Sequence, residues 1–119
     1  MSNFRKLIIW QKAMNLVTKT YNSTKIFPKE EVFGLTSQIR RCSISIPSNI
    51  AEGHGRESNK EYLRFLNFSI GSLFELQTQL EIAKNIEYLT DDDFNTIYED
   101  SREVERMLVS FINKIKERK

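Results

Sequence analysis

Apolar residues recur along the chain at the spacing of an α-helix, in four segments separated by short polar breaks. The first segment runs from about Leu7 to Lys25. When its residues are placed about 100° apart, its apolar side chains gather on one narrow arc of Trp10, Ala13, Met14, Val17, Tyr21 and Thr24. Pro28 follows, and because the residue before a proline is pushed out of the α region, the first helix is expected to end there.

The second segment, from about Lys29 to Glu52, has small or apolar residues on two sides. One side is a core stripe of Leu35, Ile39, Cys42, Ile46 and Ile50. The other side, where an exposed helix would usually carry lysine and glutamate, has Ser37, Ile44, Pro47, Ser48 and Ala51. We therefore expect this helix to bury both faces, one inside its own bundle and one elsewhere.

Two residues are expected to shape the second helix. Pro47 lacks the backbone N–H and clashes with the carbonyl four residues earlier, so it predicts a kink or a break into two helices. Gly53 is expected to end the helix as a left-handed cap, because glycine adopts that conformation without a steric penalty. Glu30 and Glu31 are expected to lie in the first turn, where the helix dipole favours negative charge.

The third segment, from about Asn59 to Glu87, has the most regular pattern. Ser58 and Glu61 form the sequence of a capping box before it. Gly71 falls on the outward side of this helix, where a glycine costs about 1 kcal/mol relative to alanine. Either Gly71 marks the close approach of a neighbouring chain, or it reflects neutral sequence drift or a slight bend of the helix. The core positions recur at heptad spacing: Tyr62, Leu66, Ser69, Leu73, Leu76, Leu80 and Ala83.

The fourth segment opens with Thr90 as the N-cap, followed by three aspartates in the positive first turn. Its core positions are Phe94, Ile97, Val104, Leu108, Phe111 and Ile115. Four amphipathic helices with short connections and no strand pattern predict an all-α fold, an up-down-up-down antiparallel four-helix bundle. Residues 1–119 are expected to form it as a single domain.

Composition narrows the functional classes. The net charge of +2 does not by itself indicate a nucleic-acid-binding protein. The chain has one cysteine, so an internal disulfide is excluded. A signal peptide and a run of about 18 apolar residues are both absent from the sequence, which predicts a cytoplasmic protein with no membrane contact.

Few residues suggest catalysis. Cys42 lies on the core stripe, and His54, in a predicted loop between glycines, has no neighbour in the sequence with which to form a catalytic dyad. An enzyme using His54 and Glu52 is the weakest of the alternatives. A single histidine cannot supply the paired Glu-x-x-His motifs of a di-metal bundle, and the aspartates at 91–93 fit helix capping better than calcium binding. The sequence thus predicts no catalytic residue, no metal site and no cofactor.

Nucleic-acid binding has more support. Five basic residues fall at or near one end of the predicted hairpin of the second and third helices: Arg40, Arg41, Arg56, Lys60 and Arg64. Arginine suits phosphate recognition because its guanidinium donates in a planar, bidentate arrangement. The alternative is a solvated face on which Glu52, Glu57 and Glu61 pair with these cations. A ring of identical chains would repeat the cations and concentrate their charge.

Most of the first ninety residues also resemble one known family. The motifs are Trp10–Met14 (WQKAM), Phe27-Pro28, Phe33–Leu35 (FGL), Gln38–Arg41 (QIRR), Ser45–Gly53 (SIPSNIAEG), Gly71-Ser72 and Glu75–Leu80 (ELQTQL). They resemble the bacterial 23S ribosomal RNA intervening-sequence proteins, although Cys42 stands where that family usually has alanine.

The resemblance implies a four-helix bundle that assembles as a homopentameric ring. Some relatives act as accessory proteins of diversity-generating retroelements, where they associate with a reverse transcriptase and nucleic acid. We therefore predict a non-enzymatic, oligomeric nucleic-acid-binding or accessory protein that uses RNA or DNA as its partner. The alternative is a structural protein-interaction scaffold that binds no nucleic acid. In either case the expected subunit interface contains Ile44, Pro47, Ala51 and Gly71.

Overall fold

The computed structural model describes residues 3–118, and every regular element in that range is helical. Residues 1, 2 and 119 of the predicted domain lie outside this range. Four α-helices form the fold: α1 (Ile8–Thr24), α2 (Leu35–His54), α3 (Asn59–Asn85) and α4 (Asp91–Lys116). Two short 3-10 turns precede α1 and α2, namely η1 (Phe4–Lys6) and η2 (Lys29–Glu31).

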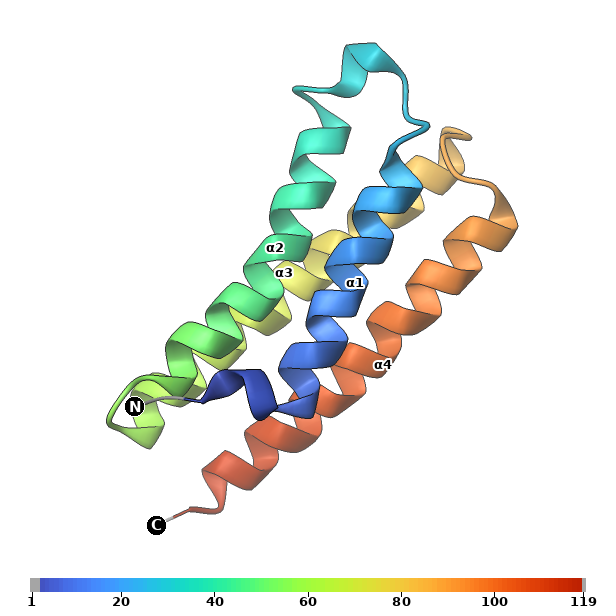
Figure 1. Ribbon diagram of the computed structural model, residues 1–119. Coiled ribbons are helices and arrows are strands. Elements are labelled where there is room, and N and C mark those ends of the chain that lie inside the picture. Colours follow the sequence, from blue (N-terminus) through green and yellow to red (C-terminus); the bar gives the residue numbers. More distant parts are fainter. Residues whose placement is uncertain (1–2, 119) are drawn as a thin grey trace.

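Consecutive helices run in alternating directions and pack side by side (Figure 1). Helix α1 packs against α2 and α4, and α3 packs against the same two helices, so the four helices enclose one core. The bundle is elongated, with principal extents of 48 × 23 × 20 Å. The all-α prediction is confirmed. No helix in the described part of the chain is long and apolar enough to cross a membrane.

The third helix matches its predicted pattern closely. All seven predicted core positions of α3 are buried, together with Phe65 and Gln77. Helix α4 buries five of its six predicted positions, while Phe111 is half-buried and Ile112 is buried instead. Ser58 and Thr90 accept hydrogen bonds from the backbone N–H groups of Glu61 (3.2 Å) and Asp93 (3.1 Å), so both predicted N-caps are confirmed.

Helix α1 buries only Ala13 and Thr24 of the predicted arc, and the rest of its buried face lies to one side of that arc, which is a correction. Its buried residues are Ile9, Ala13, Leu16, Thr20 and Thr24. Met14 and Tyr21 of the predicted arc are 41% and 36% exposed. Two threonines can lie in the core because each hydroxyl donates to the carbonyl four residues earlier, Thr20 to Leu16 at 2.8 Å and Thr24 to Thr20 at 2.9 Å. These bonds remove most of the penalty for burying a polar group.

The start of the second helix also differs from the prediction. Lys29–Glu31 form the 3-10 turn η2, and α2 begins only at Leu35, after Gly34. Glu31 nevertheless acts on the helix start, because its carboxylate accepts a hydrogen bond from the N–H of Leu35 at 3.1 Å. The other carboxylate oxygen accepts from the Tyr88 hydroxyl at 2.8 Å, which links η2 to the α3–α4 connection.

Helix α2 then runs without a break through Pro47 to His54, so of the two predicted alternatives, a kink or a break, the break into two helices is wrong. Gly53 lies inside the helix, and no glycine in the described chain has a positive φ, so the expected left-handed cap is also wrong. Gly53 is needed for packing. A Cβ at this position would lie 2.8 Å from the Phe65 Cβ and 3.1 Å from the Tyr62 ring. Only glycine allows α2 and α3 to come so close there.

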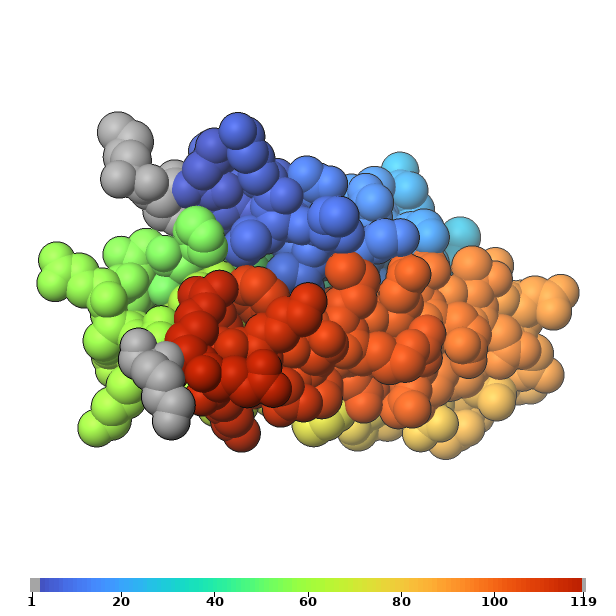
Figure 2. Space-filling view, turned by 90° about the horizontal axis from the view of Figure 1, so that it is seen from below, coloured from blue at the N-terminus to red at the C-terminus, as the bar shows by residue number. Residues whose placement is uncertain are grey.

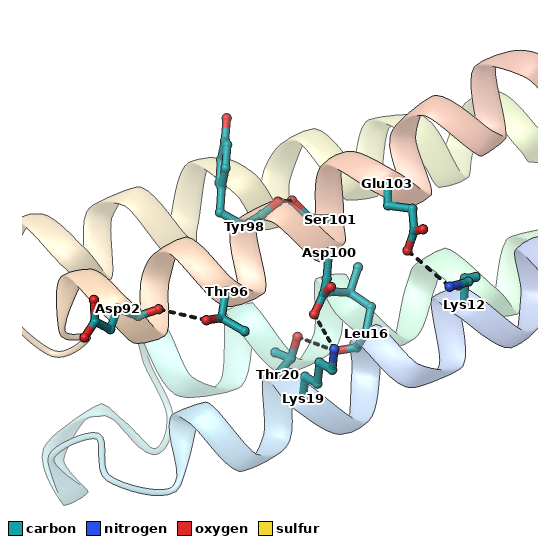
Figure 3. A network of polar contacts seen from close by, with 10 residues as sticks. All are labelled: Lys12, Leu16, Lys19, Thr20, Asp92, Thr96, Tyr98, Asp100, Ser101 and Glu103. Carbon is teal, nitrogen blue, oxygen red and sulfur yellow. Dashed lines mark hydrogen bonds and ion pairs between the residues drawn. The ribbon is translucent and has the colours of Figure 1, made fainter.

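Ion pairs join the first and last helices. Lys12 pairs with Glu103 at 3.3 Å, and Lys19 pairs with Asp100 (Figure 3). Both pairs span the outer side of the α1–α4 contact, where the core-facing Leu16 lies between them in sequence. Exposed pairs of this kind contribute little stability individually, but they favour one register of α1 against α4.

Candidate functional site

The five predicted phosphate contacts do not form one patch, which is a correction. Arg40 and Arg41 lie near the start of α2, whereas Arg56, Lys60 and Arg64 lie around the α2–α3 turn. Most of the length of α2 separates the two groups, which is roughly 20 Å at 1.5 Å per residue. The prediction had assigned all five residues to the same end of the hairpin, whereas Arg40 and Arg41 lie in the first two turns of α2, far from the α2–α3 turn.

Arg40 has a structural role. Its Nε donates to the Thr24 hydroxyl at 2.9 Å and its Nη2 donates to the carbonyl of Tyr21 at 3.4 Å. The guanidinium also lies 4.6 Å from the centre of the Tyr21 ring. These contacts hold α2 against the last turn of α1, where a positive charge is favoured by the helix dipole. Arg41, in contrast, is exposed.

The arginines of the α2–α3 turn have both carboxylate and aromatic neighbours. Arg56 lies 4.0 Å from Glu52, and Arg64 lies 3.4 Å from Glu61. The Arg56 guanidinium is also 4.7 Å from the centre of the Phe65 ring. Lys60 is exposed. The alternative of a salt-bridged face therefore describes two of these three residues, although exposed pairs are weak enough to exchange partners.

A larger electrostatic feature appears when charges are grouped by position in the bundle. The antiparallel topology brings the start of α1, the α2–α3 turn and the end of α4 to one end of the molecule (Figures 1 and 2). We call this the basic end and define it as residues 3–12, 50–64 and 106–118. It contains ten basic and four acidic residues, a net charge of +6. Its cations are Arg5, Lys6, Lys12, Arg56, Lys60, Arg64, Arg106, Lys114, Lys116 and Arg118.

The opposite end has the opposite charge. We call it the acidic end and define it as residues 19–41 and 75–100. It contains six basic and ten acidic residues, a net charge of −4. Three of its carboxylates are the consecutive aspartates that begin α4. The overall charge of +2 thus conceals a strong separation of charge along the bundle. Seven cations of the basic end were not among the predicted phosphate contacts, namely Arg5, Lys6, Lys12, Arg106, Lys114, Lys116 and Arg118.

A second candidate surface lies along α1 and α2. The side of α2 that was predicted to pack elsewhere meets the apolar arc predicted for α1, and together they line a groove of about 340 Å³. An adjoining hollow of about 370 Å³ continues it toward Val32 and Tyr21 and shares Ile44 with it. We call this the α1–α2 face. The groove is lined by Trp10, Met14, Val17, Ile44, Pro47, Ser48 and Ala51.

The four predicted interface residues fall on two different surfaces. Ile44, Pro47 and Ala51 lie on the α1–α2 face. Gly71 lies on the outward side of α3, and a Cβ added there would meet no atom within 4 Å. Phe74 is 48% exposed on the same helix. The outward side of α3 is therefore open to a neighbour, but it is separate from the α1–α2 face.

The two residues considered for catalysis occupy ordinary structural positions. Cys42 is buried, as predicted, with its Sγ 3.6 Å from a carboxylate oxygen of Glu75. Burial, followed by the nearby Glu75 carboxylate, raises the pKa of the thiol to about 11. His54 is the last residue of α2 and not part of a loop, and its ring packs edge-on against Tyr62 at 5.7 Å. Within residues 3–118, no three histidine, cysteine or acidic side chains are grouped to hold a metal ion.

These features define a class of protein: a small up-down four-helix bundle with open surfaces on its side and ends. The sequence model of the 23S rRNA-intervening sequence proteins matches residues 5–110, and the chain belongs to this family. It is also similar to the crystal structure of a protein of unknown function from the S23 ribosomal protein family of Bacteroides thetaiotaomicron. The two chains are 25% identical with a TM-score of 0.80, and the match covers 88% of this chain and 98% of the other. Comparison with curated proteins finds no match.

Proposed function

We propose that this chain is a non-enzymatic module that self-associates through the α1–α2 face and binds RNA or DNA through its basic end. The observation that carries the proposal is the net charge of +6 at one end of the bundle and −4 at the other. A surface with concentrated positive charge attracts phosphate backbones and steers their approach. The family description, which refers to 23S rRNA, is consistent with a nucleic-acid partner.

Self-association is supported by the apolar character of the α1–α2 face. Exposed apolar grooves of this kind commonly mark interaction sites. If subunits associate side by side around a rotation axis with their helices aligned, every basic end faces the same rim. The homopentamer implied by the family resemblance would then present five such ends together. Pro47 lies in the middle of this face, and a bend of α2 there stays a prediction.

The first experiment measures binding of the full-length protein to labelled RNA and DNA as a function of salt. Binding at about 50 mM salt should be clear and should weaken steeply as salt rises, because counterions are released from each neutralised phosphate. Absence of binding at that salt concentration would refute the nucleic-acid part of the proposal. A shallow salt dependence would also count against phosphate contacts.

The second experiment measures mass in solution by light scattering. Five copies of the 14.0 kDa chain would give about 70 kDa. Ile44→Glu should reduce the mass, because it places a charge within the α1–α2 face. A stable monomer of the unmodified chain would refute self-association through this face and leave nucleic-acid binding to be judged alone.

A protein-interaction scaffold is the second candidate. The pairing of Arg56 with Glu52 and of Arg64 with Glu61 favours it, since paired cations are less available to phosphate. In this case the partner is another protein, for which the family resemblance suggests a reverse transcriptase. A cytoplasmic location fits both candidates. Recovery of a protein partner from cell extract treated with nuclease would favour the scaffold, whereas recovery of nucleic acid alone would count against it.

A further inference from the structure

We propose that a groove at the basic end binds an unpaired nucleotide, with the base on the apolar floor and the flanking phosphates held by Arg106 and Lys114. This inference rests on the proposed function and specifies its ligand: single-stranded or looped nucleic acid. The groove lies between the first turn of α1 and the last turns of α4 and is distinct from the α1–α2 face.

The floor of the groove is apolar and well supported. The groove has a volume of about 420 Å³ and is lined by Leu7, Ile8, Ile9, Arg106, Met107, Ser110, Phe111 and Lys114. Ile9 is buried and anchors α1 to the core, while Ile8 is 62% exposed. The Phe111 ring packs edge-on against Tyr62 at 5.8 Å, which fixes its orientation. The floor can therefore receive a flat, largely apolar group such as a nucleobase.

The charged lining of the groove is entirely positive. Arg106 and Lys114 lie two turns apart on α4, and none of the eight lining residues is acidic. Within residues 3–118, no ion pair involves either cation, which distinguishes them from Arg56 and Arg64.

The acidic residues of neighbouring turns of α4 have other partners or positions. Glu103 pairs with Lys12 at 3.3 Å, and Glu105 accepts from Gln77 at 2.9 Å and from Arg102 at 3.1 Å. Glu117, together with Glu105, lines an adjoining hollow that shares Arg106, Ser110 and Lys114 with the groove. Because none of these carboxylates forms an ion pair with Arg106 or Lys114 within residues 3–118, both cations are available to an anionic ligand.

The combination of apolar floor and basic lining distinguishes between forms of nucleic acid. In a duplex the bases are stacked inside the helix, so only phosphates would reach the groove. An unpaired base can turn out of the base stack and pack on a protein side chain, which is how single strands are usually recognised. The basic end also places other arginines over aromatic rings, with Arg5 at 4.8 Å from Phe4 and Arg64 at 5.3 Å from Phe68. Aromatic rings and arginines are the side chains on which single-stranded bases commonly stack.

The experiment compares three polyanions with similar numbers of negative charges: a single-stranded oligonucleotide, a duplex, and polyphosphate, which has no bases. The full-length protein should bind the single strand most tightly. Ile8→Ser and Phe111→Leu should each weaken single-strand binding by about tenfold, because stacking and apolar contact with the base are lost. Both variants should leave duplex and polyphosphate binding unchanged.

Two controls make the comparison specific. Phe74→Leu removes an exposed ring from the outward side of α3 and should change none of the three affinities. The double variant Arg106→Gln and Lys114→Gln should weaken all three, and it should reduce the single-strand salt slope by about 1.4, or 0.7 for each lost phosphate contact. Ile8 is largely exposed, so Ile8→Ser tests the floor even if Phe111→Leu impairs folding.

Methionine methyl NMR gives an independent measurement. The Met107 methyl group lines the groove, and Met14 lies on the α1–α2 face. A single strand should shift the Met107 signal through the ring current of the base and leave the Met14 signal in place.

Equal affinity for single strand and duplex, or no effect of Ile8→Ser, would overturn the inference while leaving the proposed function intact. Displacement of the strand by an acidic peptide that shifts Met107 more strongly would assign the groove to a protein ligand. Failure of all three polyanions to bind would refute the proposed function itself.

Discussion

The two ends of the bundle are alike in helix geometry and opposite in charge. In an antiparallel bundle each end contains two helix starts and two helix ends, so the helix dipoles nearly cancel there. The difference between +6 and −4 therefore comes from the side chains alone. The backbone is thus equivalent at the two ends, but the side chains make one end basic and the other acidic. The overall net charge of +2 does not reveal this difference.

The largest expected effect tests this charge separation directly. Replacing Lys114, Lys116 and Arg118 with glutamine should weaken RNA binding at low salt by about two orders of magnitude and make its salt dependence shallower, since about three phosphate contacts are lost. Fluorescence anisotropy titrations at several salt concentrations measure both changes. The matched variant, with asparagine at positions 91, 92 and 93, should bind at least as tightly as the unmodified chain. If the variants change affinity only in proportion to net charge, the ends are not functionally distinct.

The next effect compares the packed interior of α2 with the open side of α3. Gly53→Ala should destabilise the fold by about 1–3 kcal/mol, because its Cβ would lie against Phe65 and Tyr62. Gly71→Ala should stabilise the isolated subunit by up to about 1 kcal/mol, because nothing lies near the new methyl group. Urea unfolding measures both. Equal effects of the two substitutions would contradict the packing described here, and a loss of oligomer in Gly71→Ala would place a neighbouring subunit against α3.

A smaller effect is expected at the helix caps of the two ends. Ser58→Ala at the basic end and Thr90→Ala at the acidic end should each cost about 1 kcal/mol, because a backbone N–H loses its acceptor. Thr96→Ala is the control, since the Thr96 hydroxyl donates to the Asp92 carbonyl within α4 and caps no helix start. Thermal unfolding should show clear losses for the first two variants and little change for the third. If only one of the two cap variants loses stability, the helix start at the other end must already be frayed in the unmodified protein.

The smallest effect concerns Glu31 at the acidic end. The hydrogen bond from the Leu35 N–H, followed by that from the Tyr88 hydroxyl, lowers the pKa of the Glu31 carboxyl below its ordinary value of 4.5. Because the folded pKa is lower than the unfolded one, the carboxylate stabilises the fold above the unfolded pKa. That contribution is lost as pH falls through the folded pKa. Glu31→Gln should therefore be less stable than the unmodified chain at neutral pH, and the difference should shrink in acid. A difference that is constant with pH would exclude the carboxylate as its cause.

The regularity of each helix explains how much of the fold could be predicted. Helix α3 also has exposed apolar residues, Phe68, Phe74 and Ile82, but its core residues recur without interruption at heptad spacing, so these positions identified the core directly. Helix α1 has two neighbouring apolar sides, one through Ile9 and Leu16 and one through Met14 and Tyr21. The pattern alone could not decide between them, because the buried side includes two threonines whose hydroxyls bond to their own helix. The rejected side then became one wall of the α1–α2 face.

The candidate site was harder to predict because it depends on which segments meet. Arg40 and Arg41 are adjacent in sequence but point about 100° apart on a helix, so one reaches Thr24 and the other reaches solvent. The groove at the basic end combines residues from both termini of the described chain, which the sequence separates by about a hundred positions. The charge separation could have been predicted from the sequence, since it requires only the predicted topology and a count of the charged residues at each end.

The buried thiol of Cys42 has a practical consequence for following the folding of this protein. It is the one cysteine of the chain, its pKa is raised to about 11, and it lies between α2 and α3 beside Glu75. A thiol reagent can therefore modify the native chain appreciably only after these two helices separate. The rate of modification, compared with that of an unstructured peptide thiol, reports how often the α2–α3 pair opens. The protein thus carries a built-in probe of local opening that needs no added label.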